Sequence, residues 1–154
     1  MSRADFHLLT TWDVPAPPER VWIELMRPQD WPAWWPAVTR ADVLDPGDAA
    51  GVGSRIRFEW KTALPYRMAF DILTTRVEPL ALIEGRASGT LDGTGRWRLA
   101  ATRGGTRVTY DWTVTVAAPG LRLVAPLARR AFTWNHDAVM RQGHQGLVTR
   151  LRRG

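Results

Sequence analysis

The sequence predicts an α+β fold in which a curved, seven-stranded antiparallel sheet packs against one long C-terminal helix. Three observations lead to this prediction. Apolar residues recur with helical period over residues 123–151, the earlier segments alternate with the period of strands, and short turns join most of them. Short connections favour antiparallel pairing, and strands followed by a helix are typical of α+β layering. With 154 residues, the chain is expected to form one domain over residues 1–154.

The first predicted strand covers residues 6–14, where one face carries Phe6, Leu8, Thr10, Trp12 and Val14. The prolines at 15, 17 and 18 end this strand and open a helix over residues 19–26, because proline is tolerated in a first helical turn. A second short helix is expected to be capped by Asp30 and ended by Pro36. Its tryptophans, at 31, 34 and 35, are expected to cover one end of the sheet.

Six more strands are predicted, at residues 38–44, 53–61, 66–77, 80–87, 89–99 and 106–116. Residues 64–66 read as a turn or a hairpin tip, and Arg103-Gly-Gly reads as a hairpin turn. The alternation slips near residues 73–77, which indicates a bulge. Glycines recur on one face of residues 89–99 and indicate strong curvature or close backbone approach.

The C-terminal helix carries one stripe that must pack against the sheet, formed by Phe132, His136, Val139, Met140, Gly143, Leu147 and Leu151. Two members are unusual for a core helix. His136 is polar, and Gly143 lowers helix stability by about 1 kcal/mol relative to alanine. The glycine is expected to let the helix approach the sheet closely, and the polar member suggests that the helix also borders a space.

Composition excludes several classes of function. The net charge of +6 comes almost entirely from arginine, but the arginines are scattered and no basic run is interleaved with aromatic residues, so nucleic acid is not an expected partner. No apolar run approaches the roughly 18 residues of a membrane span, so no integral membrane segment is expected. Cysteine is absent and the N-terminal residues lack the apolar core of a signal peptide. A cytoplasmic location is therefore expected.

Nine tryptophans stand out in the composition, and they fall mainly in strand-like segments. Bulky rings that face one helix pack poorly without leaving space, and apolar walls with a few polar groups are typical of small-molecule pockets. The sequence therefore predicts a ligand-binding cavity lined by Trp60, Met68, Phe70, Trp97, Tyr110, Trp112, Phe132, His136 and Met140.

His136 and Tyr110 are the candidate catalytic residues of this cavity. His136 could hold a ligand carbonyl or act as a general acid or base. Alternatively, it hydrogen-bonds Tyr110 or a backbone group inside a filled core. Arg129 also lies on the helix stripe, where it either meets an anionic head group or pairs with an acid on a neighbouring loop.

No metal or cofactor site is expected from the motifs. His7, His136 and His144 have no metal-binding spacing, and the glycines near residue 93 precede a strand rather than a helix, unlike a phosphate loop. No nucleophile elbow is present. The acids of the strands, Glu59, Asp71, Asp92 and Asp111, read as outward-facing. Whether the protein is an enzyme stays open at this point.

Four motifs give the chain a family resemblance that runs nearly from end to end: residues 16–22 (APPERVW), 31–36 (WPAWWP), 89–97 (GTLDGTGRW) and 135–140 (NHDAVM), the last followed by Gly143 and Gly146. With them the chain resembles the START/Bet v 1-like (SRPBCC) superfamily, in its polyketide cyclase/dehydrase-like branch. The resemblance implies a helix-grip fold with a hydrophobic cavity between sheet and C-terminal helix. It also implies relatives that bind lipids, sterols, polyketides or plant-hormone-like molecules, a minority of which catalyse cyclisation or dehydration.

Three functions follow as hypotheses. The first is a carrier or sensor that binds a small hydrophobic or aromatic ligand, lipid- or polyketide-like, as a monomer or weak homodimer. The second is a polyketide cyclase/dehydratase-type enzyme with His136 and Tyr110 as acid–base groups. The third is a partner-binding module with a filled core and an arginine-rich surface. Fold alone does not choose among them.

Overall fold

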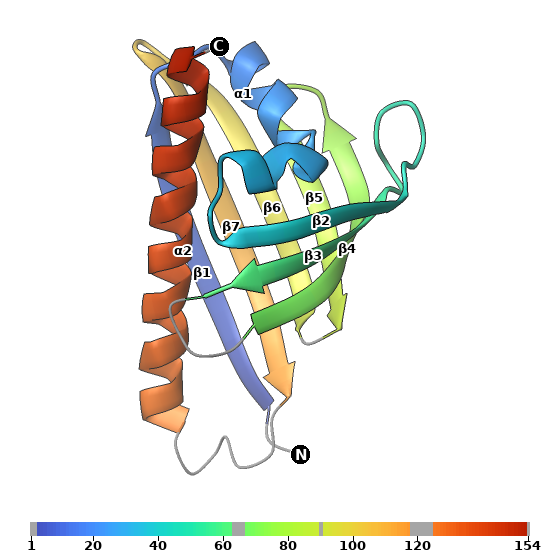
Figure 1. Cartoon of the computed structure of the whole chain (residues 1–154), viewed down its shortest axis with the longest axis vertical. Coiled ribbons are helices and arrows are strands. Elements are labelled where there is room, and N and C mark those ends of the chain that lie inside the picture. The colour runs from blue at the N-terminus through green and yellow to red at the C-terminus, as the bar shows by residue number, and fades with distance from the viewer. Residues whose placement is uncertain (1–2, 63–66, 90, 118–124, 154) are drawn as a thin grey trace.

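The computed structural model describes residues 3–62, 67–89, 91–117 and 125–153 (Figure 1). In chain order its elements are β1 (Arg3–Val14), α1 (Pro18–Leu25), the 3-10 helix η1 (Pro28–Ala33), β2 (Val38–Asp45), β3 (Arg55–Lys61), β4 (Arg67–Glu78), β5 (Leu82–Gly89), β6 (Asp92–Thr102), β7 (Gly105–Ala117) and α2 (Ala125–Arg153). This order confirms the predicted α+β class. The turn expected at residues 64–66 and the expected helix start at residue 123 lie outside the described residues.

The seven strands form one antiparallel sheet in the order β1-β7-β6-β5-β4-β3-β2. Strands β2 to β4 cross steeply over the direction of β1 and β7, so the sheet is strongly curved (Figure 1). Register shifts accompany this curvature, two of them in β2 and one in β4 between Thr74 and Arg76. The β4 shift is the predicted bulge. Gly89, which the sequence grouped with the following strand, instead ends β5 at a positive φ of 124°, as the chain turns toward β6.

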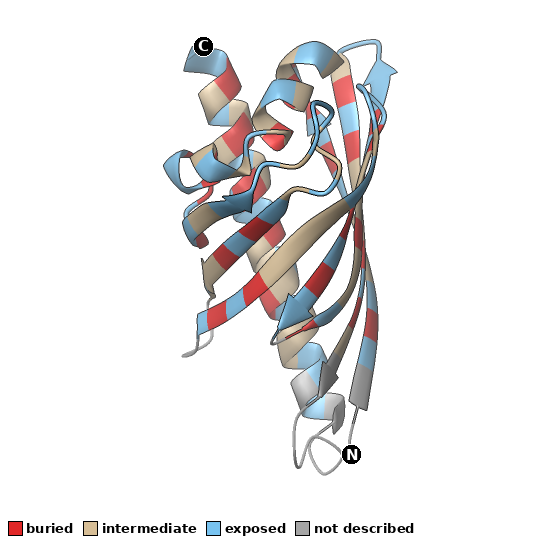
Figure 2. Cartoon of the chain, turned by 90° about the vertical axis from the view of Figure 1, so that its right-hand side faces the viewer, coloured by how far each residue is buried: buried red, intermediate tan, exposed pale blue. Residues whose placement is uncertain are grey.

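Helix α2 lies along the concave side of the sheet and contacts β1 (Figures 1 and 2). The predicted stripe is the face that packs inward. Met140, Gly143, Leu147 and Leu151 are buried, whereas Phe132, His136 and Val139 are half-buried. Among the described residues, no helix combines the length and the apolar character needed to cross a membrane.

Two local expectations were wrong. Gly143 does not face a strand: a Cβ built there would lie 2.5 Å from Cε2 of Trp35, so the glycine makes room for an indole from the loop after η1. Asp30 does not cap a helix, since it lies in the first turn of η1, and Arg27 holds the N-cap position without a side-chain hydrogen bond. Pro32, inside this segment, lacks an amide hydrogen and so removes one helical hydrogen bond, which is consistent with a short helix.

Candidate functional site

A cavity of about 290 Å³ lies between the concave face of the sheet, η1 and α2. Its walls come from α1, η1, β2 to β7 and α2. Most lining residues are buried or half-buried, whereas Gln29, Val43 and Pro46 are exposed and mark an opening. The volume places the cavity at the small end of pockets that accept small molecules.

All nine residues predicted from the sequence lie on the wall of this one cavity: Trp60, Met68, Phe70, Trp97, Tyr110, Trp112, Phe132, His136 and Met140. Strand alternation brings them together, because inward residues of β3, β4, β6 and β7 face the inward stripe of α2. Their role as ligand contacts stays a prediction.

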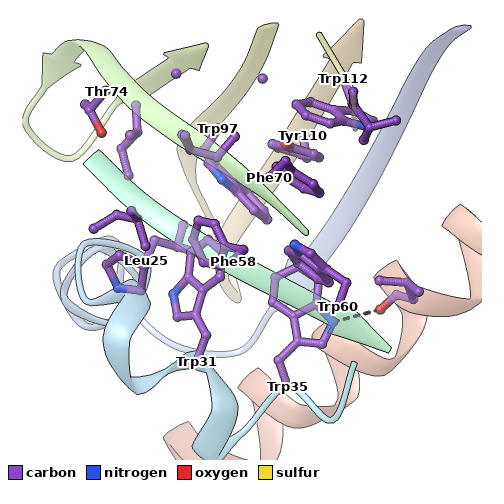
Figure 3. Close-up of a pocket in the computed structure, with 18 of the residues that line it drawn as sticks. Leu25, Trp31, Trp35, Phe58, Trp60, Phe70, Thr74, Trp97, Tyr110 and Trp112 are labelled. Carbon is purple, nitrogen blue, oxygen red and sulfur yellow. Dashed lines mark hydrogen bonds between the residues drawn. The ribbon is translucent and has the colours of Figure 1, made fainter. Parts of the chain in front are cut away.

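Sequence reasoning missed the part of the wall nearest α1 and η1. Trp31 and Trp35 line the cavity, as do Leu25, Ile56 and Phe58 (Figure 3). Ile56 and Phe58 could have been found, because they share the inward face of β3 with Trp60. The two tryptophans could not, since the six-residue 3-10 helix and the loop after it are too short to show a repeating inward pattern.

Nine Phe, Tyr and Trp side chains of the described residues line the cavity, and those labelled in Figure 3 present their rings at several angles. Trp60 stacks on Phe70 with centroids 6.2 Å apart, and Tyr110 stacks on Trp112 at 5.8 Å. Trp31 stacks on Phe58 at 5.3 Å. Stacked rings offer flat apolar faces against which another ring or a hydrocarbon chain can pack.

The tryptophans of the wall differ in whether their indole N–H group donates a hydrogen bond. Trp35 Nε1 donates to the carbonyl oxygen of Val139 at 2.9 Å, which fixes the loop after η1 to α2 (Figure 3). Trp31 Nε1 donates to the carbonyl oxygen of Glu24 at 3.0 Å. Nε1 of Trp60 is buried and has no hydrogen-bond partner among the described residues. A buried donor without an acceptor raises the free energy of the empty site.

His136 is the polar group that α2 places on the wall. Its side chain is 11% exposed, and both ring nitrogens are buried without a hydrogen-bond partner among the described residues. The nearest acid, Asp137, lies 3.8 Å from Nδ1, beyond hydrogen-bond distance. Burial lowers the pKa of His136, and Asp137 only partly opposes this shift. The imidazole is therefore neutral near pH 7, and the alternative of a hydrogen bond to Tyr110 or to a backbone group is not met among the described residues.

Tyr110 lies on the wall opposite α2, and Gly95 makes space for its hydroxyl group. A Cβ at residue 95 would lie 2.5 Å from the phenolic oxygen. Burial raises the pKa of Tyr110 far above its ordinary value, and the charge of neighbouring Asp111 raises it further. Tyr110 is therefore a neutral phenol that can donate or accept a hydrogen bond but does not ionise.

The other candidate residues lie away from the cavity. His7 pairs with Asp111 at 2.8 Å on the outer face of the sheet, and His144 stacks on Trp12 with ring centroids 5.8 Å apart. Arg129 meets neither expectation: its guanidinium donates to the carbonyl oxygen of Asp5 at 2.8 Å and covers the ring of Phe6. Among the described residues, no group of three His, Cys, Asp or Glu side chains could hold a metal ion.

Solved structures with the same fold include the ZhuI aromatase/cyclase from Streptomyces sp. R1128, with a TM-score of 0.73 and 16% identity over 99% of this chain and 95% of that one. The di-domain ARO/CYC BexL from the BE-7585A biosynthetic pathway has a TM-score of 0.76 and 17% identity, over 94% of this chain and 49% of that one. Ara h 8.0201 has a TM-score of 0.60 and 14% identity, over 96% and 99% of the two chains. These likenesses show the helix-grip fold.

No curated protein matches the sequence. Residues 6–152 match the family model described as polyketide cyclase/dehydrase and lipid transport. The match spans nearly the whole chain, and it agrees with the curved sheet, the long helix and the cavity between them. The chain therefore belongs to the polyketide cyclase/dehydrase and lipid-transport family.

Proposed function

We propose that this protein is a carrier or sensor that binds a small hydrophobic or aromatic ligand in the cavity between the sheet and α2. The observation that supports this proposal most strongly is the aromatic wall, which surrounds about 290 Å³ of space instead of filling it. Burial of apolar ligand surface against such a wall provides the main driving force for binding. Family membership favours the same function.

The test is binding by the purified chain of residues 1–154. A panel of neutral aromatic compounds and lipids is screened by the change in tryptophan fluorescence and by the shift in melting temperature, and native mass spectrometry identifies any molecule that copurifies. Bound ligand is expected to raise the melting temperature because it binds only the folded state.

A matched pair of variants locates the binding site. Val139→Phe adds a ring on the cavity wall, whereas Leu9→Phe adds one on the outer face of β1, where Leu9 is 65% exposed. Binding is expected to be lost in the first variant and kept in the second. Equal binding by both variants would place the ligand elsewhere and contradict the proposal.

The alternative function is a cyclase/dehydratase-type enzyme. One observation favours it: Tyr110 and His136, two residue types that serve as acid–base groups in enzymes, line the same cavity. Against it, no carboxylate among the described lining residues orients His136, and the nearest one is the 58%-exposed Asp137. Turnover of a polyketide-type substrate that is lost in both His136→Ala and Tyr110→Phe would establish the enzyme. Turnover unchanged by both substitutions would exclude these roles.

A further inference from the structure

The described wall of the cavity carries no Asp, Glu, Lys or Arg side chain. Its two titratable groups, Tyr110 and His136, are both held uncharged at neutral pH, because burial raises the pKa of the phenol and lowers the pKa of the imidazole. A charged group that entered this space would lose its hydration without gaining a counter-ion, which is strongly unfavourable.

Two arginines of the neighbouring strands, Arg57 and Arg96, cannot supply that counter-ion from their present positions, because each pairs with an acid on the outer face of the sheet. Arg57 forms a two-point ion pair with Asp71, at 2.9 and 3.2 Å. Arg96 pairs with Glu84 at 2.6 Å.

The wall is nevertheless not purely apolar. Nε1 of Trp60 can only donate a hydrogen bond, and it has no acceptor among the described residues. The two nitrogens of neutral His136 supply one donor and one acceptor, also unused there. The indoles of Trp12 and Trp34 are likewise unpartnered, but neither lines this cavity. Because these nitrogens are buried, a ligand acceptor reaches them only when the neighbouring side chains shift, and the hydrogen bond so formed removes the penalty of the empty site.

We infer that the ligand is an uncharged, ring-containing molecule that carries a carbonyl-type hydrogen-bond acceptor, and that carboxylates and phosphates of the same shape are excluded. Trp60 and His136 are the residues that bind the acceptor. This inference rests on the proposed function and narrows it to one class of ligand.

Three naphthalene derivatives with substituents of equal shape test this inference by calorimetry. Acetonaphthone carries a neutral acceptor, isopropylnaphthalene has none, and naphthoate carries a charge. Acetonaphthone is expected to bind at least about tenfold more tightly than either of the other two, a ratio equivalent to about 1.4 kcal/mol. Trp60→Phe and His136→Leu are each expected to reduce the advantage over isopropylnaphthalene and to leave the binding of isopropylnaphthalene nearly unchanged.

Met68→Arg tests the charge argument in the opposite direction, because it places a cation on the wall that Met68 now lines. This variant is expected to gain binding of naphthoate, and circular dichroism confirms that it is folded. Leu9→Phe is the matched control and is expected to behave as the original chain.

The outcomes separate the two proposals. If naphthoate binds the original chain as tightly as acetonaphthone, or if both polar substitutions leave the acetonaphthone preference intact, this inference is overturned and the binding function stands. If none of the three probes binds and the broader panel also fails, both proposals fall.

Discussion

The two halves of α2 carry the same kind of apolar stripe, but the C-terminal half is closely packed and the N-terminal half borders the cavity. In the C-terminal half, Leu147 is fully buried, Gly143 receives the indole of Trp35, and Arg150 pairs with Glu24 of α1 at 2.6 Å. In the N-terminal half, Phe132 and His136 are only half-buried and border the cavity. In the C-terminal half, a glycine leaves room that the Trp35 indole fills, whereas in the N-terminal half the side chains of α2 border space that no described side chain fills.

The largest expected effect comes from deleting side chains in the two halves. Leu147→Ala removes a fully buried side chain and is expected to lower the free energy of unfolding by about 3 kcal/mol. Phe132→Ala deletes more atoms, but its ring already borders a cavity, so we expect a loss below about 2 kcal/mol. Urea denaturation measures both values. Leu127→Ala, at a position 71% exposed on the same helix, is the control. If Phe132→Ala lowered the free energy of unfolding more than Leu147→Ala, the proposed difference in packing between the two halves would be wrong.

The next effect concerns the contact between glycine and indole. Gly143→Ala would gain about 1 kcal/mol from helix propensity if the site were open. Because the added Cβ meets the rigid ring of Trp35, a net loss of about 2 kcal/mol is expected instead. Gly104→Ala, where nothing lies within 4 Å of the added atom, should change thermal stability little. If Gly143→Ala instead stabilised the protein, the contact between α2 and the Trp35 indole would not be tightly packed.

A smaller effect of opposite sign is expected in the N-terminal half. His136→Leu removes two unpartnered polar atoms and should raise the free energy of unfolding by about 1 kcal/mol, while it weakens the binding of a carbonyl ligand. His144→Leu is the control, because His144 stacks on Trp12 and contacts the carbonyl oxygen of Asp13 at 2.9 Å. That control should be destabilised. A destabilised His136 variant would mean that the imidazole has a structural role.

The smallest effect is on the pH dependence of stability. Burial lowers the pKa of His136 in the folded state, so the unfolded chain binds a proton more readily than the folded one. Stability from this group is therefore complete above the unfolded pKa of about 6.5 and falls as the pH drops below it. Denaturation midpoints between pH 7 and pH 5 are expected to fall less in His136→Leu than in the original chain. An identical pH profile in the two proteins would contradict the assignment.

Much of the fold was predictable, because simple periods carry it. Strand alternation and the stripe on α2 placed nine residues on one wall, and the slip near residue 75 located the bulge in β4. Positions without a period were not predictable. Trp31 reaches the cavity from η1, and Trp35 reaches it from the loop after η1. Trp35 also fills the space beside Gly143, where a strand was expected. Arg129 donates to the backbone carbonyl of Asp5, a contact that the pattern of charged residues in the sequence does not predict.

The position of the opening gives the cavity a direction. Val43, at the exposed end, pairs with Ile56, whereas Val38 pairs with Trp60, so the opening and the Trp60 indole lie at different ends of β3. Trp60 lies four residue steps along β3 from Ile56, a span of about 13 Å. If the proposed ligand enters past Val43, it passes Ile56 and Phe58 before it reaches Trp60. Under that proposal, its carbonyl group enters first and its hydrocarbon part follows.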